Sequence, residues 1–211
     1  MSSKKKYRTI IFYKDYFEKF FVKQTDKVKD KIIWTLELLE EIDRVPENYL
    51  KHIESTSGLY EIRVKFGRDV FRIFCFFDKD KLVVLANGFQ KKTRKTPKQE
   101  IEIALRIKEE YRDEQKNRLT LDEFKDKHYG SKGTKKRDAL DSGYENFKLG
   151  TLLHEARIEK GMTQAELAEK VGTTKSYISK IENNVKEVRL STLQKIVQLG
   201  LGGTLDLSIR L

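Results

Sequence analysis

The sequence has one cysteine, Cys75, among its 211 residues, and it has no long apolar segment. A single cysteine excludes an internal disulfide framework and a cysteine-cluster metal site, which fits a reducing cytoplasm. The longest apolar stretches, 70–77 and 82–86, are far shorter than the roughly 18 residues of a membrane helix. The basic first residues are followed by no apolar core and no cleavage site, so we expect a cytoplasmic protein without a membrane partner.

Histidine and methionine are also scarce. The three histidines, His52, His128 and His154, lie in dissimilar contexts, so we expect neither a paired-histidine nuclease site nor a metal or other cofactor. No methionine lies between Met1 and Met162, so the second half has no start codon of its own. This pattern fits a natural fusion and an engineered single chain equally well.

Positive charge, in contrast, is abundant. The 44 lysines and arginines against 33 acidic residues give a formal net charge of +11, with +6 in residues 1–115 and +5 in the remainder. Such a balance favours a polyanionic partner, and nucleic acid is the first candidate. Hydrophobic residues at 38% and aromatic residues at 10% indicate a folded chain, and its length suits two small domains.

The first part of the chain reads as strand, helices, strands, helix. Residues 7–13 are rich in β-branched and aromatic residues, and 26–42 carry apolar residues at helical spacing. A three-stranded antiparallel meander is then expected over 59–66, 70–77 and 81–89, which short turns separate. Thr96 and Pro97 are expected to begin a helix that continues to about Tyr111, with Thr96 as N-cap and Gln99 completing a capping box.

Residues 112–118 contain no apolar anchor, which fits either a solvated linker or a continued exposed helix. Thr120 and Glu123 form a second capping box, and the helix that it starts is expected to end at Gly130.

The remaining residues are helical in pattern until the very end. We expect helices over 134–199, with breaks at Gly143, Gly161 and Gly172. Residues 205–211 alternate apolar and polar side chains, as a strand with one apolar face does. Such a strand can pair with a second copy to form a two-fold homodimer, cap the helical core of its own chain, or add to the first domain's sheet.

The most specific motif is a helix-turn-helix pattern over 164–182. A small residue, Ala168, stands where two helices must touch, and Gly172 stands in the turn between them. Thr163 is placed to cap the first helix. Apolar residues fill the wedge between the helices: Leu167, Val171, Ile178 and Ile181.

Residues 149–199 resemble the Cro/XRE family of helix-turn-helix repressors. The resemblance implies that a recognition helix begins near Thr174 and enters the major groove of a palindromic operator. Base edges would be read by Lys175, Ser176 and Tyr177. Phosphates would be met by Gln164, Thr173 and Ser179, and Lys180 would add charge. For each single polar residue, an ordinary solvated helix face is the alternative interpretation.

Two features of the first part bear on chemistry. Alternation places Glu61, Arg63 and Lys65 on one face of a strand, with Tyr60 on the other. Arg72 interrupts an otherwise apolar strand, where an unpaired cation is costly, so it needs a partner or a rim position. Residues 88–97 then concentrate four cations and one aromatic ring without any acidic residue.

Residues 7–111 resemble the HigB-like branch of the RelE/ParE toxin superfamily, through the order of their elements and the segments Gly58–Arg63, Phe71–Phe74 and Gly88–Thr93. Many toxins of this superfamily cleave mRNA on the ribosome, without a metal. Such cleavage needs a group that deprotonates the 2′-hydroxyl, cations at the phosphate and a donor to the leaving oxygen. The resemblance implies that Arg63 and Arg72 clamp phosphate, while Lys91, Lys92 and Lys95 transfer protons and bind the RNA backbone. A solvated or RNA-tracking surface is the alternative for each lysine.

We therefore expect an α+β toxin domain over 1–115, a linker and antitoxin extension over 116–144, and an all-α DNA-binding antitoxin domain with a C-terminal strand over 145–211. This is the order of a HigB-like toxin and a HigA-like antitoxin, and the extension is expected to pack on the toxin and keep it latent. The partners would be mRNA on the ribosome and operator DNA. Two other classes remain open: a DNA-binding regulator whose toxin-like half is inactive, and a gyrase-poisoning toxin of the ParE type.

Overall fold

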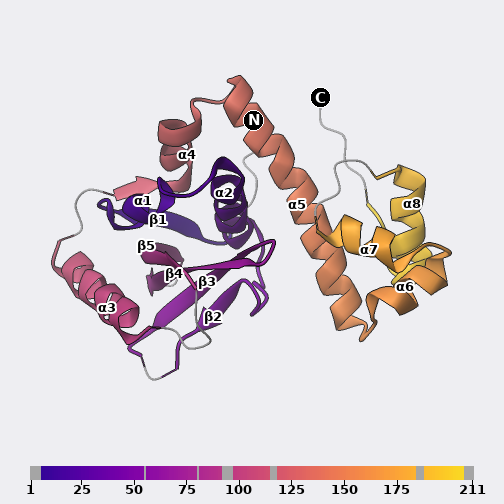
Figure 1. The fold of residues 1–211 in the computed structure, drawn as a ribbon, viewed down its shortest axis with the longest axis horizontal. Coiled ribbons are helices and arrows are strands. Elements are labelled where there is room, and N and C mark those ends of the chain that lie inside the picture. The colour runs from indigo at the N-terminus through magenta and orange to yellow at the C-terminus, as the bar shows by residue number, and fades with distance from the viewer. Residues whose placement is uncertain are drawn as a thin grey trace. The chain divides into compact units, whose positions relative to one another are not determined.

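Figure 1 shows the computed structural model, which describes residues 6–54, 56–79, 81–91, 97–114, 118–183 and 188–206. The chain divides into two units, Met1–Asp138 and Ala139–Leu211. The first combines a sheet with helices and the second is helical, so the fold is α+β, as the sequence predicts. Within the described ranges, no helix is both long and apolar enough to cross a membrane.

The first unit is organised around a six-stranded sheet with the strand order β2-β3-β4-β5-β1-β6. Its strands are β1 (Thr9–Tyr13), β2 (Leu50–His52), β3 (Leu59–Phe66), β4 (Asp69–Asp78), β5 (Leu82–Gln90) and β6 (Arg118–Thr120). β1 runs parallel to β5, and the other neighbouring pairs are antiparallel. The predicted meander is confirmed as β3, β4 and β5.

Helices cover both faces of this sheet (Figure 1). Helix α3 (Lys98–Asp113) contacts β4 and β5 on one face, where Ala104, Ile107 and Tyr111 join the core cluster that contains Ile11 and Phe74. Helices α1 (Tyr16–Phe21), α2 (Asp26–Glu41) and α4 (Leu121–Tyr129) all contact β1, and they pack on the other face. Because strand side chains alternate between faces, Phe12 faces these helices while its neighbour Ile11 faces α3.

The two shortest strands and the start of α3 differ from the sequence-based expectation. β2 and β6 have only three residues each, which is too short for an alternating pattern to be recognised. Helix α3 begins at Lys98, so Pro97 occupies the N-cap and not the first helical position. Thr96, the predicted N-cap, lies outside the described residues.

The segment after α3 belongs to the first unit. Its strand β6 pairs with β1, and the capping box of Thr120 and Glu123 starts α4 as predicted. Gly130, with φ of 85°, ends that helix. The sequence pattern divides the chain at residue 115, whereas the structure divides it after Asp138, because β6 and α4 find their partners in β1, α1 and α2.

The second unit begins within α5 (Lys135–Glu159). It also contains α6 (Gln164–Val171), α7 (Lys175–Glu182), α8 (Leu190–Lys195) and the π-helical turn η1 (Ile196–Gly200). The predicted break at Gly143 is wrong, since α5 is continuous through it. Glycine costs a helix only about 1 kcal/mol, and buried side chains recur at helical spacing around it: Leu140, Tyr144, Phe147 and Thr151.

The other two predicted breaks are confirmed, because Gly161 and Gly172 both have positive φ angles between helices. Of the predicted C-terminal strand, Leu205 and Asp206 are described and are not in a strand. Residues 207–211 lie outside the described residues.

Candidate nucleic-acid interface

The second unit contains the helix-turn-helix, formed by α6 and α7. Gly172 adopts the left-handed conformation (φ 70°, ψ 45°) that the tight turn requires. Thr163 caps α6, with Glu166 completing a capping box, and the Thr174 hydroxyl accepts a hydrogen bond of 3.2 Å from the Tyr177 amide. All four predicted wedge residues lie in one buried cluster, which also contains Leu153, Leu193 and Ile196.

Five predicted DNA-binding residues lie together on the surface of this unit. Gln164, Lys175, Ser176, Ser179 and Lys180 line one shallow depression with Asn183. Asn183 is not among the residues predicted from the sequence; it is the C-cap of α7, and its side-chain amide donates to the Ser179 carbonyl at 2.8 Å. Thr173 lies in the turn outside the residues that line the depression, and Tyr177 packs partly against the buried cluster.

Glu182, at the end of α7, is held by contacts with three side chains, His154, Arg157 and Gln164. It is 3% exposed, and Arg157 donates to its carboxylate through Nε at 2.5 Å and through Nη2 at 2.9 Å. Gln164 Nε2 donates at 2.8 Å, and His154 Nδ1 lies 3.0 Å away. Burial alone would raise the pKa of the Glu182 carboxyl, but the hydrogen bonds from His154, Arg157 and Gln164 lower it to about 2.

This network positions the candidate interface. Glu182 joins α5 to the end of α7 through Arg157, and it also orients the amide of Gln164 on α6. The helices approach closely here, because a Cβ atom on Gly150 of α5 would lie 2.7 Å from the Ile181 carbonyl oxygen. A glycine in α5 is therefore needed for α7 to lie at this distance.

In the first unit, the structure brings together the two predicted arginines. Arg63 of β3 and Arg72 of β4 are direct cross-strand partners, so they share a face of the sheet. Glu61 lies between them, with its Oε1 atom 2.9 Å from Arg63 Nε and 3.0 Å from Arg72 Nη1. By strand alternation this is the face that α3 covers, because Leu59 and Phe74 of the same strands pack in the core with α3.

Arg72 thus has the partner that a cation in an apolar strand needs, but its hydrogen-bonding groups are not all satisfied. Nε and Nη1 are buried, and neither makes a hydrogen bond of good geometry within the described residues. Burial lowers the pKa of the Arg72 guanidinium and Glu61 opposes this effect. A buried cation with N–H groups to spare is suited to an additional oxyanion, such as phosphate.

The predicted lysines are only partly described. The Lys91 amide donates to the Val70 carbonyl at 2.7 Å, which extends the pairing of β5 with β4 and places Lys91 two residues from Phe89, the partner of Arg72. Lys92 and Lys95 lie outside the described residues. Tyr60 faces away from Arg63, as alternation predicts, and its ring contacts those of His52 and Phe77.

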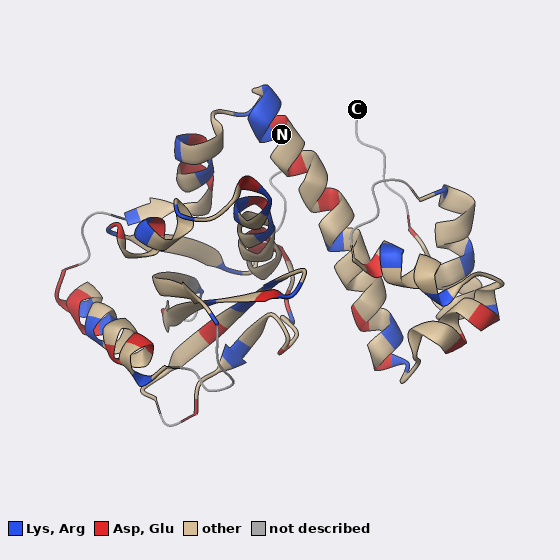
Figure 2. Cartoon of the chain, in the orientation of Figure 1, with Lys and Arg blue, Asp and Glu red and all other residues tan. Residues whose placement is uncertain are grey.

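Neither candidate interface is distinguished by an excess of charge of one sign. Lysine and arginine positions are interspersed with acidic ones over both units (Figure 2). The candidate interfaces are therefore defined by side-chain geometry, as the depression on α7 and the arginine pair on β3 and β4.

Comparison with known proteins assigns each unit separately. The family described as phage derived protein Gp49-like matches residues 19–109, and the helix-turn-helix family matches residues 153–199. No curated protein matches the chain. A crystal structure of a wild-type restriction-modification controller protein is 36% identical over 28% of this chain and 75% of its own, with a TM-score of 0.27. Residues 19–109 therefore form a Gp49-like domain of the RelE/HigB toxin type, and residues 153–199 belong to a helix-turn-helix domain of the Cro/XRE type.

Proposed function

We propose that the chain is a toxin–antitoxin module in one polypeptide, in which the second unit binds a palindromic operator as an autorepressor and silences an mRNA endonuclease formed by the first. The observation that carries this proposal is the order of the two family matches, a toxin-type domain followed by a repressor-type domain. A cytoplasmic location follows from both proposed partners.

For the DNA-binding half, the depression on α7 supplies the contacts. Lys175, Ser176 and Ser179 lie on the exposed side of a helix whose opposite side, Ile178 and Ile181, is buried. Such a helix can enter a major groove without unfolding its own core. Asn183, with an exposed side-chain amide, is added to the predicted set.

For the nuclease half, Arg63 and Arg72 would hold the phosphate at the cleaved bond. Arg72 is kept in place by burial and by Glu61, so it needs no reorganisation when the pentacovalent phosphate gains negative charge. Lys91, Lys92 and Lys95 are the proposed groups for proton transfer and backbone binding. A metal is not needed, because cations of the chain can stabilise that charge.

One matched pair of variants tests silencing and cleavage in the full chain. Leu167 is 1% exposed in the helix-turn-helix core and Leu199 is 60% exposed, so Leu167→Asp should unfold the second unit whereas Leu199→Asp should not. We expect growth arrest and transcript cleavage in cells that express Leu167→Asp. Neither should occur with Leu199→Asp, with the unaltered chain, or when Arg63→Ala accompanies Leu167→Asp.

The second candidate function is a DNA-binding regulator whose toxin-like unit is inactive. The observation that favours it is that Glu61 already pairs with both arginines and offsets part of their positive charge. If cells grow normally with Leu167→Asp while the first unit remains folded, the nuclease is refuted and this second function stands.

A further inference from the structure

Residues 118–129 form a strand and a helix that are docked on the first unit, beyond the end of the Gp49-like match at residue 109. β6 adds to the outer side of β1, with Phe12 opposite Leu119. Helix α4 then crosses β1 and inserts Phe124, which is 1% exposed, among the aromatic rings of the first unit. The Phe124 ring stacks on Phe12 with centroids 4.0 Å apart, and it contacts Phe21 at 5.1 Å.

Complementary charges surround this aromatic contact. Lys127 Nζ lies 2.7 Å from Glu18 of α1, and Lys125, which is buried, pairs with Glu37 of α2. Lys6 reaches Asp122 at 3.3 Å. The first unit therefore offers this segment an apolar pocket flanked by Glu18, Glu37 and Lys6, and the segment places Phe124 in it and pairs with the flanking charges through Lys127, Lys125 and Asp122.

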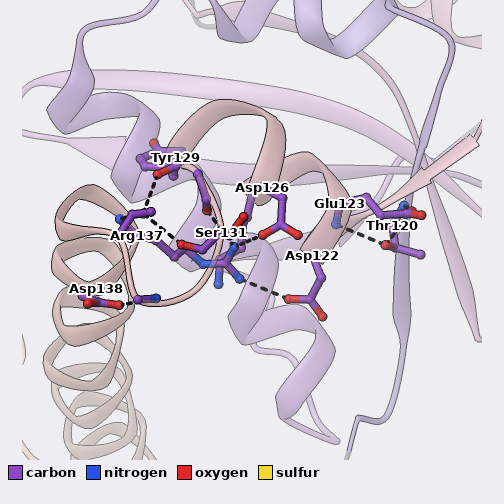
Figure 3. Close-up of polar contacts among 12 residues, drawn as sticks. Thr120, Asp122, Glu123, Asp126, Tyr129, Ser131, Arg137 and Asp138 are labelled. Carbon is purple, nitrogen blue, oxygen red and sulfur yellow. Dashed lines mark hydrogen bonds and ion pairs between the residues drawn. The ribbon is translucent and has the colours of Figure 1, made fainter.

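The segment is also anchored at its far end. Arg137, fully buried in the first turn of α5, donates to Asp126 at 2.5 Å and lies 3.5 Å from Asp122, both of α4 (Figure 3). The Thr134 hydroxyl accepts from the Arg137 amide at 3.4 Å and donates to the Ser131 carbonyl at 2.9 Å. α4 is thus held from both sides, by the sheet and by the turn that follows it.

The docked segment lies away from the arginine pair. α4 packs on the sheet face that Phe12 occupies, whereas Arg63 and Arg72 are on the face of α3. β6 borders β1, which is three strand spacings, or about 14 Å, from β3. A segment on the opposite face and at the opposite end of the sheet order does not shield these guanidinium groups.

We propose that residues 118–129 are a stabilising plug of the first unit and not its inhibitor. This proposal departs from the expectation that the extension 116–144 keeps the toxin latent: residues 118–129 complete the sheet and do not cover the arginine pair. The part that concerns RNA rests on the proposed function. Silencing, where it occurs, then has to come from the second unit.

The test uses the full chain and two variants on the same helix. Phe124→Ala empties the aromatic pocket, and Lys127→Ala removes an exposed ion pair as the control. Trp34, the only tryptophan, lies in α2 and reports the folding of the first unit through its fluorescence. We expect the urea midpoint to fall clearly for Phe124→Ala and to fall far less for Lys127→Ala, whose side chain is half exposed. An unchanged midpoint for Phe124→Ala would overturn the stabilising role.

Two readouts then separate the plug from an inhibitor. Phenylglyoxal should modify Arg63, whose side chain is 30% exposed, at the same rate in the unaltered chain and in Phe124→Ala, as measured by peptide mass spectrometry. In the Leu167→Asp background, which removes silencing by the second unit, a labelled single-stranded RNA 12-mer should bind with the same affinity with and without Phe124→Ala. It should bind about tenfold more weakly with Arg63→Gln, the loss of one charged contact. Phe124→Leu replaces Phe124→Ala if the latter is unfolded.

Faster Arg63 modification or tighter RNA binding in the folded Phe124 variant would overturn the inference, because it would show that the segment shields the site. If no variant binds the RNA, the proposed nuclease fails. The modification rate and the urea midpoint then still decide whether the segment is a plug.

Discussion

Replacing Glu182 by glutamine should destabilise the second unit strongly and in a pH-dependent manner. The hydrogen bonds from His154, Arg157 and Gln164 lower the pKa of this carboxyl to about 2 from an ordinary value of 4.5. Because the pKa is depressed in the folded state, the stabilisation is fully present above pH 4.5 and is lost as the pH falls toward 2. This difference in pKa corresponds to about 3 kcal/mol of unfolding free energy at neutral pH. The Glu182 side chain is only 3% exposed, so solvent screens its interactions little.

Urea unfolding followed by circular dichroism at 222 nm measures this effect, while Trp34 fluorescence follows the first unit separately. We expect Glu182→Gln to lose about 3 kcal/mol at pH 7, since a buried guanidinium keeps only a neutral acceptor. The difference in unfolding free energy between this variant and the unaltered chain should decrease between pH 5 and pH 3. Glu169→Gln, at an exposed position of α6, is the control and should change nothing. A difference in unfolding free energy below about 0.5 kcal/mol, or one that is constant with pH, would refute the hydrogen-bond network assigned to Glu182.

Three further predictions concern the same unit. Thr163→Ala removes the hydroxyl that accepts from the Glu166 amide, and it should cost about 1 kcal/mol by the same urea titration; a loss below about 0.3 kcal/mol would mean that the cap is not formed. Gly150→Ala should destabilise by about 1–3 kcal/mol although alanine favours helices, because the new Cβ would lie 2.7 Å from the Ile181 carbonyl oxygen, and a stabilised variant would contradict this close approach. Lys175→Ala should lower the salt dependence of duplex DNA binding, measured by anisotropy, by about one unit of slope; Lys170→Ala, which lies outside the depression, should not, and equal slopes for both would remove Lys175 from the interface.

Local signals in the sequence predicted the elements that are defined locally. The capping boxes at Thr120 and Thr163 each combine two residues three positions apart, and both helices begin where these signals place them. The meander could also be predicted from the sequence, because its strands are eight to ten residues long and short turns connect them.

Contacts between residues far apart in the sequence could not be predicted from such local signals. β6 has three residues and is a strand only because it pairs with β1, which lies more than a hundred positions earlier. The contacts of Glu182 with Arg157 and His154 cross 25 and 28 positions, and no periodicity encodes them. Glu61 offered a partial signal, since alternation places it on the face of Arg63, but its contact with Arg72 depends on the register of two strands.

The pairing of β6 with β1 also sets an order of events during synthesis. Lys6 and Asp122 form an ion pair across 116 positions, so the first strand leaves the ribosome long before its last neighbour exists. Until then the outer edge of β1 and the rings that receive Phe124 remain uncovered, which is the state in which nascent chains aggregate or bind chaperones. The first unit therefore finishes folding only as α5 is being made, and translation delivers the completed sheet together with the beginning of the DNA-binding unit.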